Sequence, residues 1–300
     1  MIRIVSIGEC MVEMAPTGDT GTYLMGFAGD TMNTAWYLRR LLDARDQVDY
    51  LTAVGDDSVS DQMVAFLDEA GLGTDHIIRR SKRTVGLYMI QLSDGERSFS
   101  YWRGQSAART LAQDQDRLMQ ALMGADIAYF SGITLAILTE EDRRRLLDAL
   151  RSFRAKGGEV VFDTNLRPAL WDSPAQMTKA VMEAAAISDT VLPSHDDEAT
   201  WFGDTDLAAT ARRYADTGAK TVVVKNGSGP MHAWQQGKTV DVTPDPVDRV
   251  VDSTAAGDSF NAGFLAAQIA GKSLEQSLQA GAQLAAKVVS HRGALVRDLD

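Results

Sequence analysis

Beyond Asp126 the sequence alternates between apolar runs of strand length and stretches in which apolar residues recur with helical spacing. No other feature limits the possible folds of the chain so strongly. Strands are expected at 127–131, 159–163, 190–193 and 220–225, and helices between them at 140–156 and 175–186. Strands that alternate with helices lie parallel in one sheet with helices on both faces. The sequence therefore predicts an α/β fold with a doubly wound, mostly parallel sheet.

The remaining apolar segments extend this pattern to both ends of the chain. We expect strands at 2–8 and 48–54, helices at 33–42 and 58–70, a hairpin at 231–234 and 238–242, and a last helix at 274–290. Between the first strand and the first helix, the segment 9–28 contains Pro16 and several glycines among short apolar pieces. Such a composition predicts strands and turns rather than a helix.

A β-hairpin interrupts the regular alternation. Two alternating runs, 84–92 and 97–103, flank the turn signal Asp94-Gly95. The hairpin is rich in aromatic residues, and because side chains two positions apart share a face of a strand, Tyr101 and Arg103 should point the same way. An aromatic face packed on the sheet is one interpretation. We favour a ligand carboxylate as the partner of the arginine.

The segment 250–265 predicts a strand, a tight turn and a helix. Its first residues are β-branched, its middle (255–257) is small, and helical spacing begins near Asp258. A helix start has unsatisfied backbone N–H groups and partial positive charge, so it forms an anion site that small side chains leave open. Asp258 is then either the helix N-cap or a group that takes a proton, and this segment alone leaves both interpretations open.

Three further loops lie where ligands bind in α/β sheets. The turn 28–33 is rich in Gly and polar residues, which cap a helix or bind hydroxyl groups. Arg167, after the strand 159–163, is a second cation at this edge, unless it caps a loop carbonyl. The turn after Lys225 contains Gly227 and Gly229. It either reverses the chain or lets the backbone approach a nucleotide.

Composition limits the class of function. The net charge of −11, without a basic tract, argues against nucleic-acid binding. There is no apolar run of about 18 residues that could span a membrane, and the N-terminus does not resemble a signal peptide. The single cysteine, Cys10, excludes an internal disulfide and fits a reducing compartment. We therefore expect a cytoplasmic protein without nucleic-acid or membrane partners.

Several classes of enzyme lack their signatures here. The chain has no Walker A motif, no dinucleotide-binding Gly-x-Gly-x-x-Gly after the first strand and no Gly-x-Ser-x-Gly elbow. Its four histidines are scattered and its cysteine is single, so a zinc cluster is not expected. The anion site, its carboxylate and the nearby cations suit phosphoryl transfer, which depends mainly on positioning and on charge stabilisation.

Two segments resemble the signatures of one enzyme family. Residues 252–260, Asp-Ser-Thr-Ala-Ala-Gly-Asp-Ser-Phe, resemble the C-terminal signature of the ribokinase-like (PfkB) carbohydrate kinases. Gly29-Asp30-Thr31 with Asn33-Thr34-Ala35 resembles their N-terminal sugar-binding signature. The resemblance covers the whole chain and implies one domain, 1–300, with a lid formed by about 13–27 and 84–103. Within the family, the segments that look like 2-keto-3-deoxygluconate kinases are 8–13, 101–103, 131–133, 163–168 and 291–294.

The resemblance implies ATP, Mg²⁺ and transfer of the γ-phosphate to the 6-hydroxyl of 2-keto-3-deoxygluconate. It makes Asp258 the general base and the backbone N–H groups of Ala255, Ala256 and Gly257 the anion hole. The residues implied around the sugar are Gly29, Asp30, Asn33, Tyr88, Tyr101, Arg103, Ile133, Arg167 and Asp258. Those implied along the nucleotide are Ser194, Lys225, Gly227, Gly229, Ala256 and Gly257. The resemblance also implies a homo-oligomer formed through the lid. It further suggests a monovalent-cation site near the closing turn.

The sequence departs from the family pattern at three places. Ala255 stands where the family often has Gly, which narrows the anion hole slightly. The family's Asn-x-x-Glu stretch, linked to Mg²⁺ and phosphate, is replaced around 194–198, where two registers are open; we assign Glu198 to Mg²⁺, through a water. An acidic residue near the end of the first strand, commonly Asp, is here Glu13.

Two alternatives remain. One is the same fold acting on another substrate, such as fructose, ribose, a nucleoside or the galactonate epimer of the sugar acid. Arg103 and Arg167 favour the sugar acid, because a neutral substrate would leave both cations without a partner. The other alternative is a non-catalytic sugar-binding protein. An intact Asp258 argues against it, since binding alone needs no base.

Overall fold

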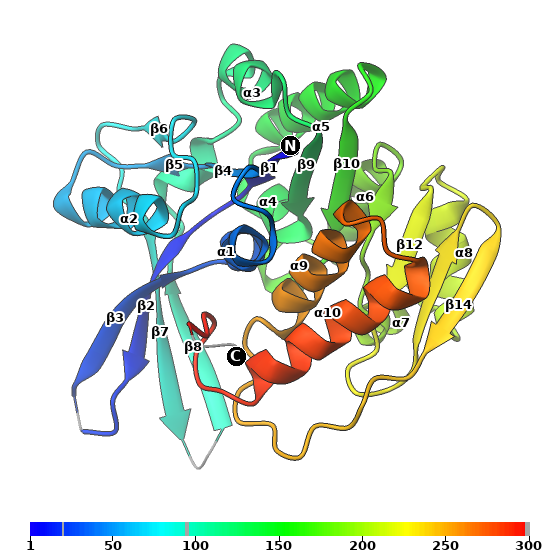
Figure 1. The fold of residues 1–300 in the computed structure, drawn as a ribbon. Helices are drawn as coiled ribbons and strands as arrows, with labels where there is room; N and C mark the ends of the chain where they lie inside the picture. The colour runs from blue at the N-terminus through cyan, green and yellow to red at the C-terminus, as the bar shows by residue number, and fades with distance from the viewer. Residues whose placement is uncertain (20, 94–95, 298–300) are drawn as a thin grey trace.

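The computed structural model describes residues 1–19, 21–93 and 96–297. A central sheet with helices on both faces forms most of the molecule, and a second, smaller sheet projects from one end (Figure 1). The predicted fold class is therefore confirmed. None of the helices within these ranges has the length and apolar character that crossing a membrane requires.

The central sheet has eight strands. In spatial order they are β14 (Lys238–Val242), β13 (Met231–Gln235), β12 (Thr221–Val224), β11 (Thr190–Val191), β10 (Glu159–Asp163), β9 (Ile127–Ser131), β1 (Arg3–Ile7) and β4 (Gln47–Leu51). The strands from β4 to β12 pair in parallel, and the hairpin of β13 and β14 adds an antiparallel edge. Because parallel strands end at the same edge, the loops after β9, β10, β11 and β12 are brought together.

The two faces of the sheet bury separate hydrophobic clusters. Neighbouring strand residues such as Tyr129 and Phe130 belong to opposite clusters, as expected from the alternation of side chains along a strand. One face is covered by α1 (Asp30–Leu41), α2 (Ser58–Glu69), α9 (Ala256–Ile269) and α10 (Leu274–Val289). The other is covered by α3 (Gln115–Leu122), α4 (Gly132–Ile137), α5 (Glu140–Ala155), α6 (Pro174–Ala185), α7 (His195–Phe202) and α8 (Leu207–Ala215).

The smaller sheet contains the predicted hairpin. Its order is β3 (Tyr23–Ala28), β2 (Met11–Pro16), β7 (Gly86–Ser93) and β8 (Glu96–Trp102). β2 pairs antiparallel with β3 and parallel with β7, and β7 pairs antiparallel with β8. The predicted turn at Asp94-Gly95 lies outside the described residues. β5 (Ala53–Val54) and β6 (Ile78–Arg79) form a separate parallel pair, and two 3₁₀ turns occur at Ala107–Thr110 and Pro168–Leu170.

The structure corrects several predicted bounds. α1 begins three residues earlier than expected, because Gly29 caps it where an added Cβ would overlap the backbone carbonyl of Glu9. The strand expected at 48–54 is divided between two sheets. The helices α3, α4, α7 and α8 were not predicted. α4 is a single short helix that the Ser131–Thr134 capping box starts directly after β9.

The segment 250–265 contains no strand. Val250 is 62% exposed, and the N–H of Val251 donates to the carbonyl of Val289 at the end of α10 (2.8 Å). The β-branched residues of this segment predicted a strand, but among the described residues no strand pairs with it. The helix itself starts at Ala256, two residues before the predicted position.

Candidate active site

The candidate active site is a cleft of about 670 Å³ at the edge where the parallel strands end, facing the second sheet. Of the predicted site residues, all of which the structure describes, those that line it are Gly29, Asp30, Asn33, Tyr88, Tyr101, Arg103, Ile133, Arg167, Ser194, Lys225, Ala255, Ala256, Gly257 and Asp258. Gly227, Gly229 and Glu198 do not line it. Phe99, Asp163 and Asp197 line it although the sequence had not assigned them to the site.

Asp258 lies in the first turn of α9 and faces α1. The N-cap of this helix is Ala255, in the left-handed conformation with φ of 60°, so the interpretation of Asp258 as the N-cap is wrong. Asn33 Nδ2 donates to Asp258 Oδ2 (2.8 Å), and Thr34 Oγ1 donates to the Asp258 backbone carbonyl (3.2 Å). These contacts fix both the side chain and the backbone of Asp258 against α1.

The surroundings of Asp258 favour its protonated form. Burial and the neighbouring Asp30 raise the pKa of Asp258 well above its usual value, and the hydrogen bond from Asn33 only partly opposes this. Burial likewise raises the pKa of Asp30, whose Oδ2 accepts from Asn165 Nδ2 (2.8 Å). A carboxylate with a raised pKa is a stronger base, which suits proton abstraction near neutral pH.

The start of α9 provides part of the predicted anion site. The helix dipole points its positive end into the cleft at Gly257 and Asp258. The N–H of Ala256, however, donates to the carbonyl of Ser253 (3.2 Å), so one of the three predicted anion-hole donors already has a partner within the turn. A Cβ added to Gly257 would lie 3.7 Å from Lys225 Nζ, which places an ammonium group beside this turn.

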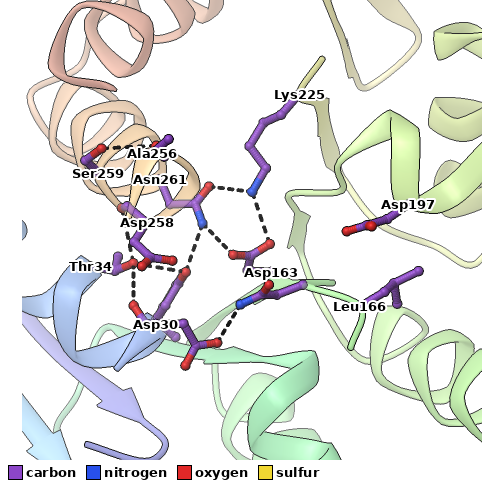
Figure 2. A network of polar contacts seen from close by, with 12 residues as sticks. Asp30, Thr34, Asp163, Leu166, Asp197, Lys225, Ala256, Asp258, Ser259 and Asn261 are labelled. Atoms are coloured by element: carbon purple, nitrogen blue, oxygen red, sulfur yellow. Dashed lines mark hydrogen bonds and ion pairs between the residues drawn. The ribbon is translucent and has the colours of Figure 1, made fainter. Parts of the chain in front are cut away.

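Lys225 belongs to a buried network that the sequence did not predict (Figure 2). Its Nζ donates to Asp163 Oδ1 (3.1 Å) and to Asn261 Oδ1 (3.1 Å). Asn261 Nδ2 donates to Asp163 Oδ2 (2.8 Å) and to the Tyr129 hydroxyl (3.0 Å). Two signals were present in the sequence: Asp163 ends a buried strand, and Asn261 interrupts an apolar helix three residues after Asp258.

Of the residues predicted to lie along the nucleotide, some line the cleft and others do not. Ser194, the N-cap of α7, forms a bridge with Lys225, and both line the cleft. Gly227 and Gly229 lie in the turn that follows β12. Gly227 has φ of 54°, a left-handed conformation that glycine adopts readily and that suits a chain reversal. The contact of these two glycines with a nucleotide stays a prediction.

The two arginines have partners within the protein. Arg103 is 8% exposed and forms an ion pair with Glu9, which is 2% exposed. Arg167 Nη1 donates to the carbonyl of Leu166 (2.6 Å) and lies 3.8 Å from Asp197 Oδ2. The prediction that a neutral ligand would leave both cations unpaired is therefore wrong. Both arginines nevertheless line the cleft, so each can share its charge with a bound anion.

An aromatic wall of the second sheet, formed by Tyr88, Phe99 and Tyr101, lines the same cleft as these arginines. The Tyr88 hydroxyl donates to Glu13. Tyr101 packs on Tyr88 and on Phe99, with ring centroids 6.0 and 6.2 Å apart. Phe99 could have been predicted, since it lies two positions before Tyr101 on the same face of the strand.

Glu198, predicted to bind Mg²⁺ through a water, does not line the cleft. Glu198 is fully buried, and its Oε2 accepts from Arg213 Nη2 (2.7 Å) and from the Tyr214 hydroxyl (2.8 Å). Asp197 instead lines the cleft, and burial raises its pKa. Successive residues of a helix point about 100° apart, so these two carboxylates face different directions.

Comparison with known proteins identifies the class. The chain belongs to the pfkB family of carbohydrate kinases, whose profile matches residues 1–298. It is 40% identical over 302 residues to the 2-dehydro-3-deoxygluconokinase of Dickeya dadantii (strain 3937), covering 98% of this chain and 96% of that protein. It is 38% identical over 305 residues to the 2-dehydro-3-deoxygluconokinase of Haemophilus influenzae, covering 99% and 96%.

A solved structure agrees with the fold described above. The fructokinase with bound ATP from Xylella fastidiosa superposes with a TM-score of 0.82 at 26% identity, covering 97% of this chain and 93% of that one. The predicted ribokinase-like architecture is therefore confirmed.

Proposed function

We propose that this protein is an ATP-dependent sugar-acid kinase that phosphorylates the 6-hydroxyl of 2-keto-3-deoxygluconate, also called 2-dehydro-3-deoxygluconate. The product is 2-keto-3-deoxy-6-phosphogluconate. The observation that carries the proposal is the position of Asp258, a carboxylate with a raised pKa in the first turn of a helix that opens into the cleft. Similarity to two proteins named for this activity, at 38–40% identity over nearly the whole chain, supports the choice of substrate.

Asp258 is the proposed general base. Its carboxylate removes the proton of the 6-hydroxyl, the hydroxyl oxygen bonds to the γ-phosphorus, and the bond from that phosphorus to the β-phosphate oxygen breaks to release ADP. The start of α9 stabilises the charge on the transferred phosphoryl group through its free backbone N–H groups and its dipole. Base and anion site lie on the same helix turn, so the acceptor hydroxyl and the phosphoryl group meet there.

The sugar is proposed to lie between the turn 29–33 and the aromatic wall. Gly29, Asp30 and Asn33 face its hydroxyl groups, and Ile133 and Tyr101 provide apolar contact. Arg103 and Arg167 bind its carboxylate with N–H groups that their present protein partners leave available. An arginine offers five donors, so an ion pair with one carboxylate leaves N–H groups for another.

ATP is proposed to extend from the start of α9 past Lys225 and Ser194. Among the described residues, no group of three or more His, Cys, Asp or Glu side chains is placed to hold a metal ion. Mg²⁺ usually binds through substrate phosphates and one or two carboxylates. Asp197 is the carboxylate that we propose for it. Bound Mg²⁺ would neutralise part of the charge of ATP in a cleft that already contains several aspartates.

A neutral sugar is the second candidate substrate. The pairing of Arg103 with Glu9 favours it, because this cation needs no ligand carboxylate. The similarity to a fructokinase points in the same direction. We therefore test the proposal by measuring ATP consumption with 2-keto-3-deoxygluconate, its galactonate epimer, fructose, ribose and adenosine. A kcat/KM for fructose or ribose above that for the sugar acid would reject the proposed substrate, and no turnover at all would reject the kinase.

We propose that the strands at about 13–27 and 84–103 form the lid of one domain, 1–300, and that the lid pairs with a second copy. The exposed apolar side chains of this sheet, Leu24 and Trp102 among them, support this. Closure would exclude water from the phosphoryl acceptor. A monovalent-cation site near the closing turn is a further proposal. There Asp252 accepts from the N–H groups of Thr254 (3.0 Å) and Gly293 (2.7 Å).

A further inference from the structure

Asp163 has no part in the proton transfer, yet both of its carboxylate oxygens are engaged inside the cleft wall. It is the last residue of β10 and is 3% exposed. Oδ1 accepts from Lys225 Nζ (3.1 Å), and Oδ2 accepts from Asn261 Nδ2 (2.8 Å). Figure 2 shows these three side chains, from β10, from α9 and from the residue after β12, converging between Asp258 and Asp197.

The ammonium group of Lys225 is held with a definite orientation. It has three donors, and the described residues provide acceptors for two of them, on Asp163 and Asn261. The group lies beside the first turn of α9, since a Cβ added to Gly257 would be 3.7 Å from Nζ. The third donor is therefore available to an anion at this turn.

A buried ion pair of this kind is weak evidence for stability. Removing two charges from water costs several kcal/mol, which their attraction often only offsets. The same sheet also holds an aspartate–lysine pair at its opposite edge, where Lys220 Nζ lies 2.9 Å from Asp189 Oδ1 and its side chain is 63% exposed. An aspartate–lysine ion pair between the segments of neighbouring strands can thus form without burying the lysine.

We infer that Asp163 and Asn261 are positioning residues that hold the Lys225 ammonium against the terminal phosphates of ATP at the start of α9. This rests on the proposed function, since it takes the anion at that turn to be a nucleotide phosphate. Asn261 is one helical turn after Asp258, so the two side chains share a face of α9. One helix therefore fixes both the base and the cation that faces the transferred group.

A hydrogen-bonded chain also links the two ends of this arrangement. Asn261 Nδ2 donates to the Tyr129 hydroxyl (3.0 Å), and this hydroxyl lies 3.2 Å from Thr34 Oγ1, within hydrogen-bond distance. Thr34 Oγ1 also lies within hydrogen-bond distance of the Asp258 carbonyl (3.2 Å). The spacing between Lys225 and Asp258 is thus set by buried contacts rather than by mobile surface side chains.

The test is a double-mutant cycle on nucleotide affinity, which requires no sugar. The dissociation constant of a nonhydrolysable ATP analogue with Mg²⁺ is measured by calorimetry for the wild type, Asp163→Asn, Lys225→Ala and the double variant. If Asp163 were only a negative charge near the phosphates, its removal would tighten binding. If it holds Lys225, Asp163→Asn weakens binding by about tenfold, the loss of one oriented charged hydrogen bond.

The background without Lys225 separates these two effects. In Lys225→Ala, adding Asp163→Asn should leave the affinity unchanged or improve it, because no ammonium remains to be oriented. Asp189→Asn, which breaks the pair at the opposite edge, is the matched control and should leave the affinity unchanged. If Asp163→Asn does not fold, Asn261→Ala provides the same test without changing a charge, with a weakening of a few-fold expected.

Each outcome decides the inference. Tighter binding in Asp163→Asn, or equal losses with and without Lys225, would overturn it, as would a wild type that binds no nucleotide. A wild type that binds the analogue but does not phosphorylate 2-keto-3-deoxygluconate would reject the proposed substrate, while the cycle would still judge the role of Asp163.

Discussion

The two edges of the central sheet each contain an aspartate–lysine pair, but the pKa values of carboxylates at the two edges are shifted in opposite directions. At the edge where the strands begin, burial alone would raise the pKa of Asp189, yet the Val160 N–H, Lys220 and Arg154 together lower it. At the edge where the strands end, burial raises the pKa values of Asp30, Asp197 and Asp258. The first arrangement stabilises the fold, whereas the second leaves carboxylates poised to bind protons or cations.

The largest expected effect is a loss of kcat that occurs for a carboxylate at the edge where the strands end and not for one at the edge where they begin. Asp258→Asn should lower kcat by about 100-fold or more with little change in the KM for the sugar, because the variant keeps the hydrogen bond from Asn33 but cannot accept a proton. Steady-state kinetics with 2-keto-3-deoxygluconate measure both constants. Asp189→Asn is the control and should retain kcat. A similar loss of kcat in this variant would mean that replacing an aspartate at either edge has this effect, and that Asp258 has no special role.

A smaller effect is expected for the arginines. Arg167→Ala should raise the KM for the sugar acid by about tenfold, the value of one charge-assisted contact, and change kcat less. Arg154→Ala removes a cation from the opposite edge, where Nε donates to Asp189 Oδ1 (3.1 Å), and should leave KM unchanged. An unchanged KM in Arg167→Ala would remove this residue from the sugar site.

The proposed assignment of Asp197 to Mg²⁺ predicts different effects for substitutions at two adjacent residues, Asp197 and Glu198. Asp197→Asn should raise the Mg²⁺ concentration needed for half-maximal activity by roughly a few-fold, since one carboxylate contact to the ion is lost. Glu198→Gln should leave that concentration unchanged, because this side chain is buried against Arg213 and Tyr214. Titration of activity with Mg²⁺ at saturating ATP compares the two, and the reverse order would restore the sequence-based assignment.

The smallest expected effect is on stability, and its sign differs between the edges. Because the pKa of Asp258 is raised, the folded state loses stability as pH rises from about 3.9, the unfolded value, through the folded pKa. Asp258→Asn removes that loss, so its Tm at pH 7 should exceed that of the wild type by roughly 2–4 °C, the shift expected for about 1 kcal/mol.

Asp189 has the opposite sign. Its pKa is lowered, so its contribution to stability is present above the unfolded pKa and is lost as pH falls through the folded one. Asp189→Asn should therefore lower Tm at pH 7, and the difference from wild type should shrink in acid. Calorimetry at two pH values checks both variants. A lower Tm for Asp258→Asn at pH 7 would show that its carboxylate is stabilised rather than strained.

Local patterns in the sequence determined the architecture and the place of the cleft. The alternation of strands and helices predicts parallel strands, and parallel strands bring Arg167, Ser194 and Lys225 to one edge whatever their order. Small residues at 255–257 likewise predicted a helix start open to an anion. The strands and the helix start could be predicted because backbone periodicity and helix termini depend on residues that are close together in the chain, whereas the anion site stays a prediction.

Tertiary structure decided which charges meet. Glu9 pairs with Arg103, 94 residues away, Asp163 with Lys225, 62 away, and Asn33 with Asp258, 225 away. The direction of α7 likewise selected Asp197 over Glu198 for the cleft. No local propensity encodes such pairings, because they follow from strand order and side-chain direction once the sheet and its helices have packed.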